Sequence, residues 1–135
     1  MKFLKFKLFA FVVALAALGS CDIGSDEDQV CSASVYAPAT DVTGPETAIV
    51  NQEVSYSVKF NITNTCGSFI NFAASSGFPK QIAPVVNYEG CECSNLTSTQ
   101  VKNYIYTPTQ VGTYEFKFLT GTNLYITKTL VVTEE

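Results

Sequence analysis

Histidine, arginine and tryptophan are absent from this chain of 135 residues. Without histidine, there is no Ser-His-Asp or Cys-His pair for nucleophilic catalysis and no imidazole ligand for zinc, haem or copper. Without arginine, and with a formal net charge of −4, the chain has no basic face for a phosphate backbone, so we expect no nucleic-acid binding. The sequence motifs GxGxxG, GxxxxGK(S/T) and GxSxG are also missing.

Little chemistry remains for an enzyme. A pair of Asp or Glu carboxylates is sufficient for some hydrolases, but the acidic residues of the domain are few and gather at its ends and in turns. We therefore expect a non-enzymatic protein with no catalytic residues, no metal site and no cofactor. A carboxylate-dependent hydrolase is the least favoured alternative.

The first twenty residues have the layout of a secretory signal. Three lysines within the first seven residues give a basic start, and the eleven residues 8–18 form an uninterrupted apolar run. Crossing the hydrocarbon core of a bilayer takes roughly 20 helical residues, so this run is too short to span it. Two small residues then lead to Cys21.

The segment Leu18-Gly19-Ser20-Cys21 resembles the lipobox of bacterial lipoproteins. The resemblance implies that residues 1–20 are removed and that Cys21 carries a diacylglyceryl thioether and, usually, an acyl group such as palmitate on its amine. Each buried methylene contributes about 0.8 kcal/mol, so several acyl chains together anchor a protein that does not span the membrane. The resemblance implies a place in the bacterial cell envelope, on the outer membrane. A plain signal peptide or an uncleaved anchor, with Cys21 present by chance, is the alternative.

Residues 21–29 are acidic and nearly free of apolar side chains, so we expect a flexible tether. Ser25, Asp26 and Glu27 resemble the surface-export signal of lipoproteins in the Bacteroidota. A solvated linker explains them equally well, so the leaflet and exposure at the cell surface stay open. Without residues 1–20, five lysines stand against twelve acidic residues, a formal charge of −7. Anionic headgroups repel such a chain, so the lipid must supply the anchoring.

Residues 30–135 are expected to form one domain with a β pattern throughout. Between Glu53 and Thr63, five apolar residues alternate with polar ones, which places all five on one face of a strand. Pro84 suggests that its strand lies at a sheet edge or contains a bulge. About seven short strands with turn signals between them predict an all-β, antiparallel sandwich of the immunoglobulin-like or fibronectin-like type. The remaining strands are expected within residues 31–36, 47–50, 68–73, 83–88, 99–106, 113–119 and 124–133.

The segment from Pro108 to Phe116 reads PTQVGTYEF. It resembles the turn that leads into the sixth strand of immunoglobulin-like domains. The resemblance implies a tyrosine corner at Tyr114, whose hydroxyl would bond to main chain nearby. Phe116 takes the place of the second inter-sheet cysteine of antibody domains, and Tyr56 or Val58 takes the place of the first. The resemblance is therefore to the broad immunoglobulin-like class of bacterial surface domains.

Four cysteines remain after Cys21. Export permits disulfides, and four cysteines allow three pairings. A bridge between Cys91 and Cys93 would close a strained ring, so we expect Cys31 and Cys66 each to reach the turn that contains Cys91 and Cys93. The alternative is a thiol-based site, in which the four thiolates hold zinc or copper(I), or Cys91 and Cys93 exchange disulfides.

The expected function is that of a lipid-anchored binding or structural module of the envelope, with a protein or a glycan as its unidentified ligand. Loops at one end of the sandwich, including residues 90–95, are the expected contact surface. Tyr104, Tyr106 and Tyr125 are candidates for stacking on a sugar or a partner, although aromatic residues in strands more often fill the core.

Overall fold

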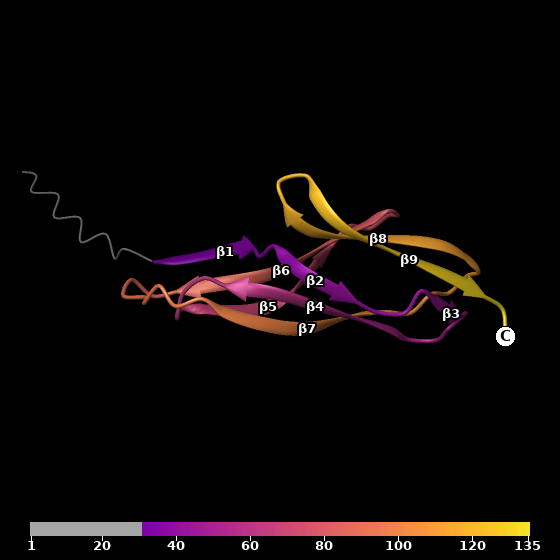
Figure 1. The fold of residues 1–135 in the computed structure, drawn as a ribbon, viewed down its shortest axis with the longest axis horizontal. Coiled ribbons are helices and arrows are strands. Elements are labelled where there is room, and N and C mark those ends of the chain that lie inside the picture. Colours follow the sequence, from indigo (N-terminus) through magenta and orange to yellow (C-terminus); the bar gives the residue numbers. More distant parts are fainter. Residues whose placement is uncertain (1–30) are drawn as a thin grey trace, which may run out of the picture.

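The computed structural model describes residues 31–135. The expected signal peptide, Cys21 and the tether lie outside these residues. The described chain forms nine strands rather than the seven or so expected (Figure 1). No helix able to cross a membrane occurs between residues 31 and 135. The strands are β1 (Ser32–Tyr36), β2 (Ala39–Thr43), β3 (Thr47–Ile49), β4 (Val54–Ile62), β5 (Gly67–Ala74), β6 (Lys80–Glu89), β7 (Ser98–Tyr106), β8 (Gly112–Gly121) and β9 (Leu124–Thr133).

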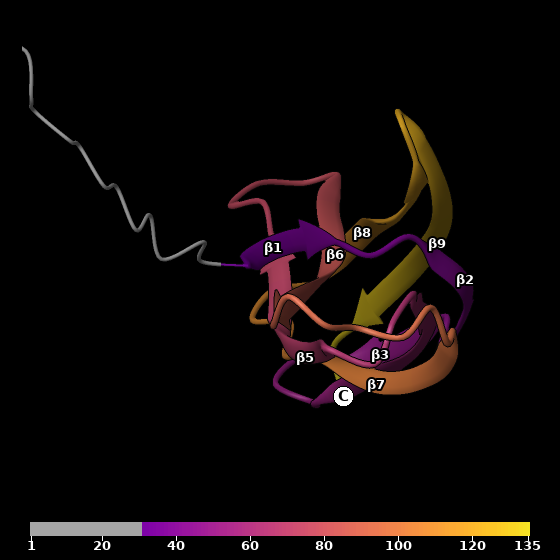
Figure 2. The ribbon, with the colours of Figure 1, turned by 90° about the vertical axis from the view of Figure 1, so that its left-hand side faces the viewer.

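The strands form two sheets that pack as a sandwich, which confirms the expected all-β class (Figures 1 and 2). The larger sheet has the order β1-β6-β8-β9-β3, with β5 also paired to β6, and the smaller sheet has the order β2-β4-β7. Five of the strand pairs are antiparallel, as expected, and two are parallel. β3 runs parallel to β9, and β6 runs parallel to β8.

The alternating residues of β4 form the centre of the core. All five apolar side chains of this strand are buried, and the polar ones between them are exposed or half-buried, which confirms the expected register. Phe116 and Phe118 of β8 and Ile82 of β6 pack in the same interior. Complete burial of a large apolar side chain contributes about 1.5–3 kcal/mol, so these buried side chains of β4, β6 and β8 together supply much of the stability of the domain.

The amino-terminal part of the domain crosses from one sheet to the other twice. β1 pairs with β6 of the larger sheet, β2 with β4 of the smaller sheet, and β3 with β9 of the larger sheet. Pro38 lies at the first crossing and Gly44-Pro45 at the second. Proline is tolerated at these places because they lie outside the strand ladders, so its missing N–H removes no ladder hydrogen bond. The chain keeps its direction at the second crossing, so β3 meets β9 in parallel. The sequence pattern misses β2, because these prolines make its five residues read as part of a turn.

Pro84 lies in a central strand, so the expectation of an edge strand is wrong. β5 occupies one edge of β6, and the other edge is shared, by β8 along residues 80–82 and by β1 along residues 85–89. Pro84 falls between these two partners, where no N–H is needed, and its carbonyl accepts a hydrogen bond from the N–H of Ala37 at 2.9 Å. The bulge lies in β5, between Phe69 and Asn71.

Candidate functional site

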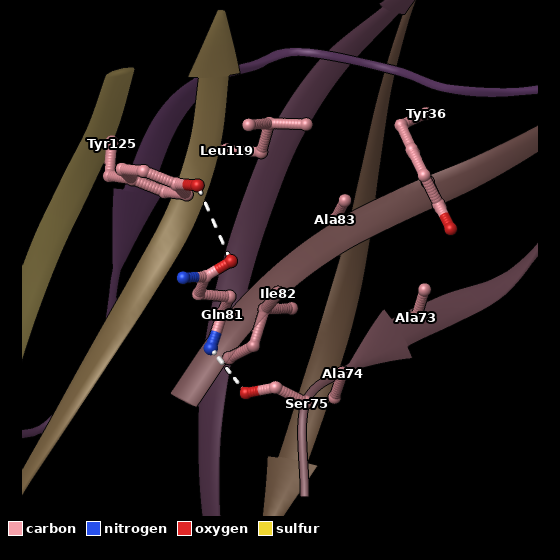
Figure 3. Close-up of a pocket in the computed structure, with 9 residues that line it drawn as sticks. All are labelled: Tyr36, Ala73, Ala74, Ser75, Gln81, Ile82, Ala83, Leu119 and Tyr125. Atoms are coloured by element: carbon pink, nitrogen blue, oxygen red, sulfur yellow. Dashed lines mark hydrogen bonds between the residues drawn. The ribbon is translucent and has the colours of Figure 1, made fainter. Parts of the chain in front are cut away.

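A hollow of about 410 Å³ opens where β1 and β8 part from β6 (Figure 3). Ile82 points into the core, so its neighbour Ala83 points to the outer face of the larger sheet. Ala73 of β5 lies opposite Ala83 in the ladder. These two small side chains leave room above the sheet and form the floor of the hollow.

Tyr36 and Tyr125 stand on opposite sides of this floor (Figure 3). Tyr36 is the last residue of β1 and is 62 % exposed, whereas Tyr125 lies near the start of β9 and is half-buried. Leu119 of β8 pairs with Tyr125 across the hairpin and adds apolar surface on that side. The walls therefore come from strands that are held in place by backbone ladders.

Polar groups gather near Tyr125. Its hydroxyl donates a hydrogen bond to Oε1 of Gln81 at 3.4 Å, and the main-chain N–H of Gln81 donates to Oγ of Ser75 at 2.9 Å (Figure 3). Within residues 31–135, neither Nε2 of Gln81 nor the hydroxyl of Tyr36 forms a hydrogen bond. Both groups are free to bind a ligand.

None of the nine residues that line the hollow is charged. The ammonium of Lys80 lies beside it and donates to the main-chain carbonyl of Ser75 at 2.7 Å. A second depression, of about 540 Å³, lies beside the carboxyl terminus and is bordered by Glu134 and Glu135. It has no aromatic walls. Only the first of these two depressions combines aromatic faces with unused polar groups, which is the composition of a small-ligand site.

The expected disulfides are present. Cys31 is joined to Cys91 and Cys66 is joined to Cys93, over 60 and 27 residues of sequence. On the chain-entropy estimate, bridges that close loops of these lengths each contribute about 3–4 kcal/mol. Gly90 precedes both partners with a φ of 122°, a conformation that favours glycine, and its N–H donates to the carbonyl of Cys31 at 2.8 Å.

Cys31 directly precedes β1, and loop 90–97, which holds Cys91 and Cys93, lies at the same end of the sandwich (Figure 1). Loop 90–97 is thus tied to β1 by one bridge and to the turn between β4 and β5 by the other. Among residues 31–135, no group of three or more His, Cys, Asp or Glu side chains is arranged to hold a metal ion.

The hydroxyl of Tyr114 donates to the carbonyl of Gln110 at 2.8 Å. This is the kind of bond that a tyrosine corner makes. Tyr104 and Tyr106 pack against Phe116 with ring centroids 6.4 and 5.1 Å away. Burial is the main cause that raises the pKa of both phenols. A neighbouring tyrosine raises it further, Tyr106 for Tyr104 and Tyr114 for Tyr106. These two tyrosines therefore pack against the core and do not line the hollow.

Of the three tyrosines considered for stacking, only Tyr125 lines the hollow. Sequence reasoning missed Tyr36, Gln81 and Ser75. No local pattern singles them out, because β1 and β6 lie far apart in the sequence and meet only through strand pairing. The run Ala73-Ala74-Ser75 was the one available signal, since small residues in a strand leave room above it.

No protein-family model, curated protein or solved structure matches this chain. A proposal for its function therefore rests on its own residues.

Proposed function

We propose that this chain is a lipid-anchored, non-enzymatic protein of the bacterial envelope that uses its sandwich to bind a ligand in the hollow between Tyr36 and Tyr125. The observation that carries the binding function is the aromatic-walled hollow, lined only by uncharged residues, with its unused polar groups. The anchor rests on the lipobox-like segment that ends at Cys21.

The position of the hollow suits a protein held at its amino-terminal end. Nine residues separate Cys21 from Cys31, and a fully extended chain of nine residues spans at most roughly 30 Å. A lipid on Cys21 therefore keeps the disulfide end of the sandwich toward the membrane. Loop 90–97 is at that end, whereas the hollow is lined by Tyr36, at the far end of β1 from Cys31, and by Ala83, within β6. This favours the hollow over the loop as the contact surface.

We also propose that the sandwich is of the immunoglobulin-like type. The bond from Tyr114 to Gln110 supports it. So does the packing of Phe116 on Tyr56, because the resemblance puts these residues where antibody domains have their inter-sheet cysteines.

The anchor is tested by labelling growing cells with an alkyne analogue of palmitate and separating membranes from soluble protein. We expect the natural chain to be labelled and membrane-bound, and the Cys21→Ser variant to lose both properties. An unlabelled natural chain, or a variant that stays with membranes to the same extent, contradicts the proposal. Protease treatment of intact cells then tells a surface-exposed domain from a periplasmic one.

The thiol-based alternative is tested on the same exported protein. Mass spectrometry without reducing agent is expected to show a mass four hydrogens below that of the all-thiol chain. Four free thiols, or a metal ion bound in native spectra, would favour the alternative in place of the binding module.

A further inference from the structure

We infer that the hollow between Tyr36 and Tyr125 binds an uncharged saccharide. The inference rests on the proposed binding function and specifies the ligand class for the same site. None of the lining residues is charged, and the chain from residue 21 onward has five lysines against twelve acidic residues. The ammonium of Lys80 lies beside the hollow, where it already donates a hydrogen bond to the main-chain carbonyl of Ser75 at 2.7 Å. An anionic ligand therefore meets the net negative charge of the chain and finds no charged group among the lining residues, and a cationic ligand finds no carboxylate there.

The unused polar groups argue against a purely apolar ligand. Nε2 of Gln81 and the hydroxyl of Tyr36 are without hydrogen bonds within residues 31–135. An apolar occupant would cut both groups off from water without replacing the hydrogen bonds they make there, which disfavours binding. The ligand must therefore carry donors and acceptors of its own.

The aromatic walls require an apolar surface on the same ligand. Tyr36 and Tyr125 flank a floor of two alanines, and Leu119 lies beside Tyr125 (Figure 3). A sugar ring meets both requirements, because its C–H face packs on an aromatic ring or a flat apolar floor while its hydroxyls point outward to amides and phenols. The volume of about 410 Å³ lies within the range of small-ligand sites.

A peptide that adds a strand to the sheet is the competing occupant. Such binding needs unpaired main-chain groups at a sheet edge. At the floor of the hollow β6 offers none, because Ala83 pairs with Ala73, Pro84 has no N–H, and the Pro84 carbonyl already accepts from Ala37. Within the described chain, β1 and β5 each have a free edge, but it is the edge that faces away from β6. The geometry thus favours side-chain recognition of a compact, hydroxyl-rich ligand.

The test uses the full chain, expressed in bacteria and purified in detergent. Detergent keeps both the lipidated and the unlipidated chain in solution, so the binding measurement does not depend on lipidation. The protein is screened against immobilised neutral oligosaccharides built from hexoses and N-acetylhexosamines, against uronic-acid and sulfated polymers, and against neutral peptides. We expect binding to at least one neutral oligosaccharide. Tyr36→Ala and Gln81→Ala should each weaken it at least tenfold, and ligand saturation-transfer NMR should show the sugar C–H protons in contact with protein.

Leu96→Ala is the matched control, because Leu96 is 66 % exposed, as Tyr36 is at 62 %, and lies on loop 90–97. It should bind as the natural chain does. Urea unfolding of all three variants tells lost folding from lost binding. No neutral saccharide bound, equal binding by Tyr36→Ala, or binding only to charged glycans or to peptides would overturn the inference. If palmitate labelling still depends on Cys21 in that case, the anchor proposal stands and only the ligand assignment fails.

Discussion

Tyr56 and Phe116 face each other across the centre of the sandwich, with their ring centroids 5.2 Å apart. Tyr56 comes from the smaller sheet and Phe116 from the larger, and both are fully buried. A pair of this kind contributes about 0.5–1.5 kcal/mol beyond the area it buries. The sheets are therefore joined at their centre by packing, while both covalent bridges lie at one end.

The Tyr56 ring also packs beneath the second crossing of the chain, so Gly44→Ala should destabilise the domain. A Cβ at Gly44 would collide with the ring of Tyr56, whose hydroxyl donates to the carbonyl of Pro45 at 3.1 Å. We expect the free energy of unfolding in urea to fall by about 1–3 kcal/mol, the usual range for overpacking. Gly77→Ala is the control, because a Cβ there meets nothing within 4 Å. Equal losses for the two variants would contradict the packing described.

The stability of the domain should depend on pH through Tyr56. Burial raises the pKa of Tyr56 from 10.0 to about 12. The folded state holds the phenol proton more tightly than the unfolded state, so the contribution is complete below pH 10 and is lost as the pH rises toward 12. Unfolding free energies measured between pH 8 and pH 12 should fall less steeply in Tyr56→Phe. Some slope should remain, because the pKa values of Tyr104 and Tyr106 are also raised. Identical slopes in both proteins would refute this role.

Tyr114→Phe should lower the free energy of unfolding by about 1 kcal/mol, the usual net contribution of one hydrogen bond. The variant removes only the oxygen that donates to the carbonyl of Gln110 and keeps the ring, which packs on Phe78 at 4.9 Å. Chemical denaturation gives the value. Tyr114→Leu, which removes the ring as well, should cost more. A Phe variant as stable as the natural chain would mean that water replaces the bond fully.

Removing one disulfide should unfold only a local segment, whereas removing the other should destabilise the whole domain. No side chain of β1 is buried, so replacing Cys31 and Cys91 by serine should free β1 while the core stays folded. Cys66 and Cys93 join two loops that flank β4, β5, β6 and β7, so their replacement should lower the global free energy of unfolding by about 3–4 kcal/mol.

Hydrogen exchange separates these outcomes. In the Cys31/Cys91 variant, the amides of β1 should lose protection while those of β4 keep it. In the Cys66/Cys93 variant, protection should fall across the core. Uniform loss in the first variant would show that β1 belongs to the cooperative unit.

Sequence patterning predicted those parts of the fold that depend on local alternation. In β4, apolar residues at every second position are enough to define the buried face, and the structure buries all five. The same reasoning misses β2, whose residues between Pro38 and Gly44 have no such run. It also misplaces Pro84, because whether a proline is tolerated depends on which strands lie beside it. Strand neighbours are a property of the whole topology, which alternation does not encode.

The candidate site was less accessible to sequence reasoning for a similar reason. Tyr125 was a candidate because it is an aromatic residue in a strand, and Tyr104 and Tyr106 were candidates on the same ground. Only the pairing of β8 with β9 and of β5 with β6 separates the tyrosine that lines the hollow from those that pack against the core. The cysteines were more informative, since a turn with two of them can receive two distant partners.

The bridge between Cys31 and Cys91 has a mechanical consequence. A force applied to the amino-terminal end of the domain reaches Cys31 first and passes through sulfur to Cys91, close to the end of the central strand β6. The load therefore bypasses the exposed strand β1, whose hydrogen bonds would otherwise unzip one after another. Tension is carried into the middle of the larger sheet, where many ladder bonds share it.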